Sequence, residues 1–251
     1  MRVHRNPWWL VWANDCNEAG PTMTASLGVQ THPATAAMPR TIYTLWLQGE
    51  ALAPPIVRLN LRRWAALNPN YVLRVLDRHD VAGWLADSGI PLDTMPIQAL
   101  SDMMRARVLL LEGGIWTDAS AFPSRPLDDW LPAALNQAGF FAFDRPDADR
   151  AVASWFLAAS PGHRMMQQWW TEVRRFWSKP RTLARYPNGI IPADPVWTVA
   201  PDGGAATDEF PYFWFHYLFG YLPETDPAFA AQWALCPKVP AGPPPAHRSI
   251  S

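Results

Sequence analysis

Residues 99–120 read ALSDMMRARVLLLEGGIWTDAS. From Ile97 to Leu111 the apolar residues recur at spacings of three and four, which predicts a helix with one apolar stripe. Gly113-Gly114 ends this helix, since glycine readily adopts the left-handed backbone that follows many helices. Ile115-Trp-Thr117 predicts a short strand, with Asp118 at its carboxyl end. The stretch therefore predicts a helix, a tight turn, and a strand that ends in an acidic residue.

The segments on either side alternate between strands and helices. Strand patterns cover residues 41–47, 71–76, 115–117, 139–143 and 154–158, and helical patterns cover residues 54–67, 80–88, 97–111, 162–178 and 210–221. Such an order predicts an α/β fold with a mainly parallel sheet flanked by helices. Ligands of these sheets bind outside the carboxyl ends of the strands. Asp118 and the turn after Trp46 are expected at that edge.

The composition narrows the functional classes. The chain has 251 residues, of which 49% are hydrophobic and 17% charged, and this is typical of a globular protein. A formal net charge of −1 gives no basic footprint, so we expect no nucleic-acid partner. Cys16 and Cys236 offer neither a metal spacing nor a disulfide framework, which suits a reducing cytoplasm. The 15 tryptophans suit core packing, or stacking on sugar rings or a nucleobase.

The two ends of the chain differ from its middle. Residues 1–38 are rich in Thr, Ala, Asn and Pro without a sustained period, which predicts a poorly ordered extension or a start codon placed too early. We expect one ordered domain over residues 39–251, in which the Pro-rich stretch from residue 237 forms a closing loop. No apolar run reaches the ~18 residues of a membrane span.

Asp102 and Arg105 are three positions apart, so they share one helix face, away from the predicted apolar stripe. Taken alone, the two residues predict a solvated ion pair on an exposed helix. Asp118 changes this interpretation, because the turn and the strand bring a second carboxylate toward the same end of the sheet. The three residues then form a candidate binding set.

Together these motifs resemble the DXD-containing sugar-binding glycosyltransferases, which include capsular polysaccharide synthesis transferases, yeast outer-chain mannosyltransferases and glucosylating clostridial toxins. The matching residues are Ser101-Asp102-Met-Met-Arg105 and Gly113-Gly-Ile-Trp-Thr-Asp-Ala-Ser120. Weaker similarity covers Pro39 to Asp77, Ser154 to Ala159 and the aromatic block around His216. The chain is most similar to the capsular branch, where Trp-X-Asp-Ala-Ser/Thr is the usual form.

The resemblance implies a GT-A fold, a Rossmann-like sheet that holds a nucleotide diphosphate sugar. By position, Trp46 would stack on the base, expected to be uracil, and Asp102 would bind ribose or sugar hydroxyls. Arg105 would contact the donor sugar or its diphosphate, and Asp118 would bind hydroxyls and orient water on a metal ion. Gly113-Gly114 would supply the turn that brings helix and strand together.

The sequence departs from the family pattern at Ser120, where the last acid of Asp-X-Asp is expected. We favour a weak Mn²⁺ or Mg²⁺ site in a working enzyme, formed by Asp118, Ser120 and His247, with His216 as another late histidine. Alternatively, positive side chains replace the metal, or the protein binds a donor without turnover. The candidate cations are Arg105, Arg145, Arg164, Lys238 and Arg248.

Further candidates have two interpretations each. His216 is expected to be a core histidine with its hydrogen bonds satisfied. Asp208-Glu209 is interpreted as a helix N-terminal cap in preference to an acidic pair that faces the acceptor. Asp144 and Arg145 follow a predicted strand, and either line a sugar pocket or are surface charges.

The resulting expectation is an enzyme that transfers a hexose from a UDP-sugar, or less favourably a GDP-sugar, to a saccharide or glycolipid hydroxyl, with retention, in bacterial polysaccharide biosynthesis. We expect it in the cytoplasm, with peripheral association at the inner membrane face and lipid-linked acceptors. The alternatives are a non-catalytic nucleotide-sugar or carbohydrate-binding protein on the same fold, and a Trp-rich scaffold without a nucleotide site.

Overall fold

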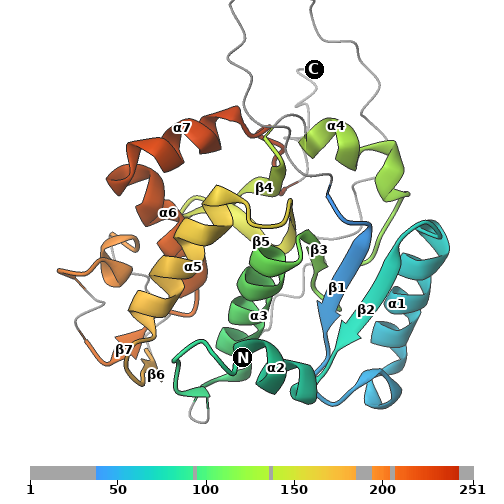
Figure 1. Ribbon diagram of the computed structural model, residues 1–251, viewed down its shortest axis with the longest axis horizontal. Helices are drawn as coiled ribbons and strands as arrows, with labels where there is room; N and C mark the ends of the chain where they lie inside the picture. Colours follow the sequence, from blue (N-terminus) through green and yellow to red (C-terminus); the bar gives the residue numbers. More distant parts are fainter. Residues whose placement is uncertain (1–37, 93–94, 136–137, 185–193, 204–206, 243–251) are drawn as a thin grey trace, which may run out of the picture.

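The computed structural model describes residues 38–92, 95–135, 138–184, 194–203 and 207–242 (Figure 1). The extension expected at residues 1–38 lies outside the described residues, apart from Met38. Among the helices that are described, none combines the length and the apolar character needed to cross a membrane.

A five-stranded sheet with the order β2-β1-β3-β5-β4 forms the centre of the molecule. Its strands are β1 (Thr41–Leu45), β2 (Val72–Leu76), β3 (Gly114–Thr117), β4 (Phe140–Asp147) and β5 (Arg150–Ala159). β1 pairs in parallel with β2 and β3, whereas β5 is antiparallel to both β3 and β4. All strands except β5 therefore point the same way, and the predicted α/β fold with a mainly parallel sheet is confirmed.

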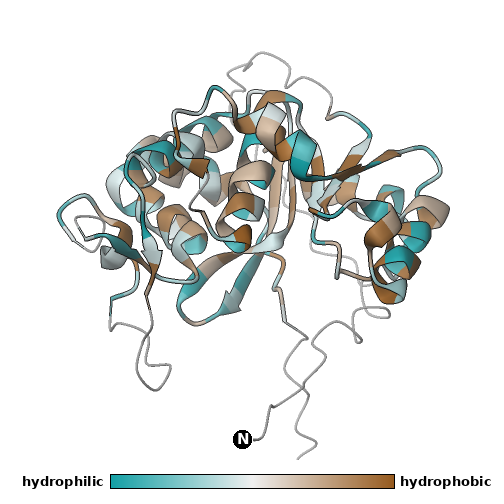
Figure 2. Cartoon of the chain, turned by 90° about the horizontal axis from the view of Figure 1, so that it is seen from below, coloured by the Kyte–Doolittle hydropathy of each residue, from teal (hydrophilic) through white to brown (hydrophobic). Residues whose placement is uncertain are grey.

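Helices cover both faces of this sheet (Figure 1). They are α1 (Pro55–Leu67), α2 (Arg78–Leu85), α3 (Ile97–Leu111), α4 (Leu131–Leu135), α5 (Arg164–Phe176), α6 (Trp214–Thr225) and α7 (Pro227–Leu235). Short 3-10 turns are η1 (Glu50–Leu52), η3 (Leu127–Asp129) and η5 (Trp197–Val199), and β6 (Thr182–Leu183) pairs with β7 (Glu209–Phe210). Figure 2 shows hydrophobic and hydrophilic residues side by side along the helices, as amphipathic helices require.

Alternation along the strands creates two separate cores. Tyr43 and Phe140 belong to a large cluster with α2, α3, α5, α6 and α7, while their neighbours Ile42 and Phe141 pack on the other face with α1 and α4. Successive side chains of a strand point to opposite faces, so each buried strand serves both cores. The sheet is thus buried on both sides, and its carboxyl edge is left for ligands.

Several elements differ from the sequence prediction, and the two helices at the C-terminal end, α6 and α7, differ most instructively. α6 begins at Trp214, after a turn in which the Trp214 amide donates to the Pro211 carbonyl, and not at residue 210. α7 was not predicted, because its sequence is apolar around most of its circumference and shows little periodicity. The signal for it was Asp226-Pro227: the Asp226 carboxylate accepts from the Ala228 and Phe229 amides, and proline occupies the first helical turn.

The Gly113-Gly114 turn joins α3 to β3 at close quarters. Gly113 has φ 66° and Gly114 has φ 95°, which side-chain-bearing residues rarely adopt. A Cβ at Gly113 would lie 2.6 Å from the Pro161 nitrogen, and one at Gly114 would lie 2.7 Å from the Thr41 carbonyl oxygen. The glycine pair therefore allows the end of α3 and the start of β3 to contact the neighbouring chain segments.

Candidate functional site

Asp102, Arg105 and Asp118 meet at the carboxyl edge of the sheet, and we call them the inner cluster. The Arg105 Nη2 atom lies 3.4 Å from Asp102 Oδ1 and 3.1 Å from Asp118 Oδ1. Asp102 is 8% exposed and Arg105 is 5% exposed. The structure thus brings together the three residues that the sequence grouped by spacing, and it places Asp102 and Arg105 out of bulk water.

The interpretation of Asp102 and Arg105 as a solvated ion pair is wrong. α3 is buried around most of its circumference, because it packs against β5, α2 and α5 as well as β3. The expected apolar stripe is also not the buried face throughout, since its end members Ile97 and Leu111 are 55% and 46% exposed. A helix enclosed on several sides buries its polar face too, which periodicity alone does not reveal.

Arg105 has further partners on β5 and on its own helix. Its Nη1 atom donates to the Ser154 carbonyl and to Ser154 Oγ, both at 2.6 Å. Its Nη2 atom donates to Ser101 Oγ at 3.1 Å, and its guanidinium lies 5.4 Å from the Trp116 ring centroid. Sequence reasoning missed Ser154 as a site residue, although its segment was part of the resemblance. These contacts hold the guanidinium in one orientation.

Asp118 is the member of the inner cluster that faces solvent. Its side chain is 34% exposed, and its Oδ1 atom accepts a hydrogen bond of 3.1 Å from Trp116 Nε1. Its backbone amide donates to the Trp155 carbonyl, which ties the end of β3 to β5. Asp118 is therefore fixed from within the protein and still accessible to a ligand at the sheet edge.

Burial dominates the protonation of Asp102. Loss of water, with a smaller contribution from the charge of Asp118, raises the pKa of this carboxyl to about 7. The charge of Arg105 and a hydrogen bond from the Trp214 side chain lower the pKa in part. Trp214, at the start of α6, was not identified from the sequence. Burial thus favours the protonated carboxyl, whereas a ligand that donates hydrogen bonds to Asp102 favours the carboxylate.

Trp46 follows β1 at the same edge. It is partly buried and packs against a small cluster that includes Val57, Leu61 and Ala119, the residue directly after Asp118. Its Nε1 atom is buried and has no hydrogen-bond partner within the described ranges. The position beside the inner cluster suits the expected contact with a base, which stays a prediction.

The metal site expected at Asp118, Ser120 and His247 stays a prediction. Ser120 is exposed and lies two positions after Asp118, whereas His247 and Arg248 lie outside the described residues. Across the part of the chain that the structure describes, no three His, Cys, Asp or Glu side chains are grouped to hold a metal ion. Arg105 beside Asp118 also opposes a second positive charge there. The described residues therefore do not by themselves fit a divalent cation.

Two of the other candidate cations lie on the surface or are engaged elsewhere. Arg164 is exposed at the start of α5. Lys238 donates to the Cys236 carbonyl at 3.1 Å and lies 3.2 Å from the Trp233 ring centroid. Neither residue has a contact with the inner cluster.

The interpretation of Asp208-Glu209 as a helix cap is wrong. Lys179 Nζ lies 2.8 Å from Asp208 Oδ1, Glu209 belongs to β7, and the nearest helix, α6, has Phe213 as its N-cap. Asp144 is half-buried on β4, with Arg145 Nε 3.8 Å from its Oδ2 atom. The Arg145 side chain is 82% exposed and lines a pocket with His216.

His216 is not the satisfied core histidine that the sequence predicted, because it is half-buried and lines this pocket. Its Nδ1 atom is buried but has no hydrogen-bond partner among the described residues. Burial, followed by the charges of Arg105 and Arg150, lowers the pKa of His216 to about 3. The imidazole is therefore neutral at physiological pH, and one of its nitrogens is unsatisfied.

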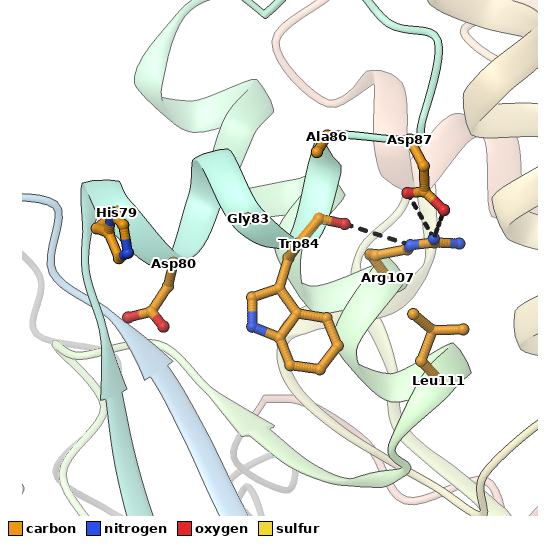
Figure 3. Close-up of a pocket in the computed structure, with 8 residues that line it drawn as sticks. All are labelled: His79, Asp80, Gly83, Trp84, Ala86, Asp87, Arg107 and Leu111. Atoms are coloured by element: carbon orange, nitrogen blue, oxygen red, sulfur yellow. Dashed lines mark hydrogen bonds and ion pairs between the residues drawn. The ribbon is translucent and has the colours of Figure 1, made fainter.

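A separate pocket of about 470 Å³ lies over α2 and α3 and contains no member of the inner cluster. Figure 3 shows the Asp87 carboxylate and the Arg107 guanidinium pointing toward each other at one side of it, with Trp84 beside them. The Arg107 Nη2 atom lies 2.7 Å from both Asp87 oxygens, and the Asp87 side chain is 72% exposed. We call Asp87 and Arg107 the outer pair.

Comparison with known proteins identifies several relatives. The chain is 28% identical over 167 residues to the O-glycosyltransferase braB of Annulohypoxylon truncatum, covering 58% of this chain and 39% of that protein. It is 27% identical over 152 residues to the putative glycosyltransferase HOC1 of Saccharomyces cerevisiae, covering 52% and 38%. It is 29% identical over 137 residues to the initiation-specific alpha-1,6-mannosyltransferase of Schizosaccharomyces pombe, covering 45% and 34%.

The chain thus spans less than half the length of these curated relatives. Among solved structures, the PaToxG glycosyltransferase matches with a TM-score of 0.42 and 11% identity, covering 78% of this chain and 74% of that one. The model of the capsular polysaccharide synthesis protein family matches residues 29–187, which include β1, α3, β3 and β5 with the whole inner cluster. This chain belongs to the capsular polysaccharide synthesis protein family.

Proposed function

We propose that this protein is a glycosyltransferase that moves a hexose from a nucleotide diphosphate sugar, with UDP as the favoured nucleotide, to a hydroxyl of a saccharide or glycolipid. The observation that carries the proposal is the inner cluster at the carboxyl edge of the sheet. Its support from outside is the family membership and the names of the relatives, which are glycosyltransferases.

The two carboxylates suit the hydroxyl groups of a nucleotide sugar. A carboxylate accepts hydrogen bonds on both oxygens, and adjacent hydroxyls of a ribose or hexose present donors at matching spacing. Asp118 is partly exposed to solvent, whereas Asp102 is buried. Burial favours the protonated form of Asp102, and a ligand hydroxyl that donates a hydrogen bond to it favours the carboxylate. We propose that Asp118 makes the first contact with the donor substrate and that Asp102 adds selectivity for hydroxyl groups.

Arg105 acts in this proposal as a positioning residue. Both of its terminal nitrogens already face protein acceptors, namely Ser154, Ser101 and the two carboxylates. It therefore has little capacity left for a diphosphate, and its main effect is to hold Asp102 and Asp118 at one place. A departing nucleoside diphosphate builds up negative charge that other groups must stabilise.

The need for a divalent cation stays a prediction. We expect Mn²⁺ or Mg²⁺ to bind mainly through the diphosphate itself, because these ions prefer oxygen ligands and bind substrate phosphates with few protein ligands. Chelation with EDTA should then abolish turnover, and Mn²⁺ should restore it. Full activity in EDTA would show that fixed positive side chains supply the charge.

The proposal also includes three features that rest on the family resemblance. They are retention of anomeric configuration, lipid-linked acceptors, and association with the inner membrane face. Proton NMR of the product measures the anomeric configuration directly. Fractionation of expressing cells measures membrane association.

The decisive experiment combines binding with turnover. A thermal-shift screen of UDP, GDP and their sugars, with and without Mn²⁺, identifies the nucleotide, and donor hydrolysis or transfer is then measured with the best donor. We expect Asp118→Ala to lose both signals. Asp87→Ala is the matched control, since it removes the carboxylate of the outer pair. Wild-type binding and turnover in Asp118→Ala would overturn the assignment.

One observation favours a second candidate, a protein that binds a nucleotide sugar without turnover. Ser120 occupies the position of the expected second acid and is exposed. Calorimetry separates the two functions: nucleotide binding without turnover of any donor in the panel, at any Mn²⁺ concentration, would favour this candidate.

A further inference from the structure

α6 links the inner cluster to a second pocket. Trp214 hydrogen-bonds Asp102, and the Phe215 ring centroid lies 6.0 Å from the Arg105 guanidinium. The next residue, His216, lines a pocket of about 720 Å³ between α6 and the β4–β5 turn. Three consecutive residues therefore reach from the buried carboxyl of the inner cluster to this pocket.

The sheet topology places the pocket at the same edge as the inner cluster. β5 runs antiparallel to β3, with Phe156 opposite Thr117, so the earlier residues of β5 extend beyond the end of β3. Ser154 is one of these residues and binds Arg105, and Arg150 and Ala151 further along line the pocket. The pocket and the inner cluster are thus neighbours along one strand as well as along α6.

One wall of the pocket is held by a network of charges. Arg150 Nη2 lies 2.7 Å from Asp147 Oδ2, and Arg150 Nε lies 3.0 Å from Asp149 Oδ1. The Arg150 guanidinium lies 3.8 Å from the Phe213 ring centroid, and the Tyr217 hydroxyl donates to Asp149 Oδ2 at 2.6 Å. These contacts fix the β4–β5 turn against α6, so this wall is formed before any ligand arrives.

The opposite wall contains His216, whose Nδ1 atom is enclosed by protein atoms, so the ring nitrogen left for a ligand in the pocket is Nε2. Arg105 and Arg150 both disfavour a positive imidazole, so the ring stays neutral. A neutral imidazole carries one N–H donor and one nitrogen acceptor, and a hydroxyl group can pair with either.

The charges of the lining select among ligands. Asp147, Asp149 and Glu224 contribute three carboxylates, against the two guanidinium groups of Arg145 and Arg150. This excess of negative charge disfavours a phosphate or diphosphate, so the pocket does not suit the nucleotide end of the donor. Carboxylates, guanidinium groups and a neutral imidazole together suit a neutral molecule rich in hydroxyl groups.

We propose that this pocket binds the saccharide acceptor as a neutral sugar unit, and that His216 hydrogen-bonds one of its hydroxyl groups. The acceptor role rests on the proposed function, whereas sugar binding at His216 does not require turnover. In this arrangement α6 contacts both substrates: Trp214 supports the carboxyl that faces the donor, and His216 contacts the acceptor two residues later.

Saturation-transfer NMR tests the proposal with methyl glycosides of glucose, galactose, mannose and N-acetylglucosamine as probes. We compare wild type with His216→Phe, which removes the hydrogen bond, and His216→Gln, which keeps a neutral donor and acceptor near the position of Nε2. His79→Phe is the matched control, because His79 lines the pocket over α2 and α3. Melting curves and circular dichroism show which variants are folded.

We expect at least one glycoside to bind wild type, to bind at least tenfold more weakly to His216→Phe, and to bind His216→Gln within about threefold of wild type. The affinity for UDP should stay within about threefold in all three variants. Binding of no glycoside, or equal binding by wild type and folded His216→Phe, would overturn the proposal. A matching loss of UDP affinity in His216→Phe would also overturn it, by assigning the pocket to the donor.

The proposed function fails by a different result. UDP binding that is unchanged in Asp118→Ala would contradict the donor site at the inner cluster. The glycoside site at His216 would still be tested separately by the His216 variants.

Discussion

Arg105 and Arg107 lie two positions apart on α3 and face opposite environments. The side chain of Arg105 is 6% exposed and lies within reach of two carboxylates, whereas Arg107 is 14% exposed and pairs with a carboxylate that is 72% exposed. Figure 3 shows the outer pair beside its open pocket. The same residue types thus form a buried cluster on one side and a surface ion pair on the other. The comparison shows that sequence spacing alone does not distinguish a buried cluster from a surface ion pair, because the surrounding elements decide how much water reaches each charge.

The largest expected effect is on stability. Arg105→Met leaves Asp102 and Asp118 close together without their cation, and removing one partner of a buried ion pair costs ~3–5 kcal/mol. Arg107→Met leaves only Asp87, which is already solvated, without its ion-pair partner. The expected loss of folding free energy for this exposed pair is ~0–1 kcal/mol. Urea denaturation monitored by tryptophan fluorescence measures both. Equal losses in the two variants would break the comparison.

The next effect is on activity. Asp118→Ala should lower the rate of donor turnover by ~10²–10³-fold, the size found when one preorganised polar group is removed from an active site. Asp87→Ala should stay within about twofold of wild type, since the outer pair touches no member of the inner cluster. Initial rates with a saturating nucleotide sugar and Mn²⁺ measure the difference. A comparable loss in Asp87→Ala would move the site to the pocket of Figure 3.

Two glycines extend the comparison to the backbone. Gly114→Ala should destabilise the fold by ~1–3 kcal/mol, because a Cβ at φ 95° would lie 2.7 Å from the Thr41 carbonyl. Gly83 lies in α2 beside the outer pair, where a Cβ meets nothing within 4 Å. Gly83→Ala should stabilise the protein by ~0.5–1 kcal/mol, because alanine favours helices. Thermal melting of both variants measures the contrast, and destabilisation by Gly83→Ala would contradict it.

The smallest effect is a pH dependence. The pKa of Asp102 is raised from 3.8 to about 7, so the folded state keeps this proton after the unfolded state has released it. The resulting stability is present at acidic pH and is lost as pH rises through about 7. Asp102→Asn lacks this loss, so its melting temperature relative to wild type should rise between pH 5 and pH 8.

Asp87→Asn is the control for this measurement and should show no such change. His216 acts in the opposite direction, because its pKa is lowered from 6.5 to about 3 and its stabilising effect is lost as pH falls below 6.5. The difference between Asp102→Asn and wild type removes this shared contribution. A difference that is flat from pH 5 to pH 8 would show that Asp102 ionises like an exposed carboxyl.

Much of the fold could be predicted from local patterns. The β-prone runs became β1 and β2 with their ends shifted by one or two residues, and the helix over residues 97–111 has the predicted bounds. α7 was missed because its apolar residues surround the helix, and the extent of β5 was underestimated because residues 150–153 carry no strong strand signal. Local patterns fail where a helix has no polar face to set its period or where a strand is extended by pairing with a distant strand.

The sequence by itself determined the order of strands and helices, the tight turn at Gly113-Gly114, and the spacing that groups Asp102, Arg105 and Asp118. These features depend on side-chain periodicity and backbone conformation, which act over a few residues. Only the tertiary structure decided that Asp102 and Arg105 are buried, that Ser154 and Trp214 support them, and that His216 faces a pocket beside them. Those properties arise because β5 and α6, which are distant from α3 in the sequence, pack around it and exclude water. A pattern over a few neighbouring residues does not reveal which distant segments will do this.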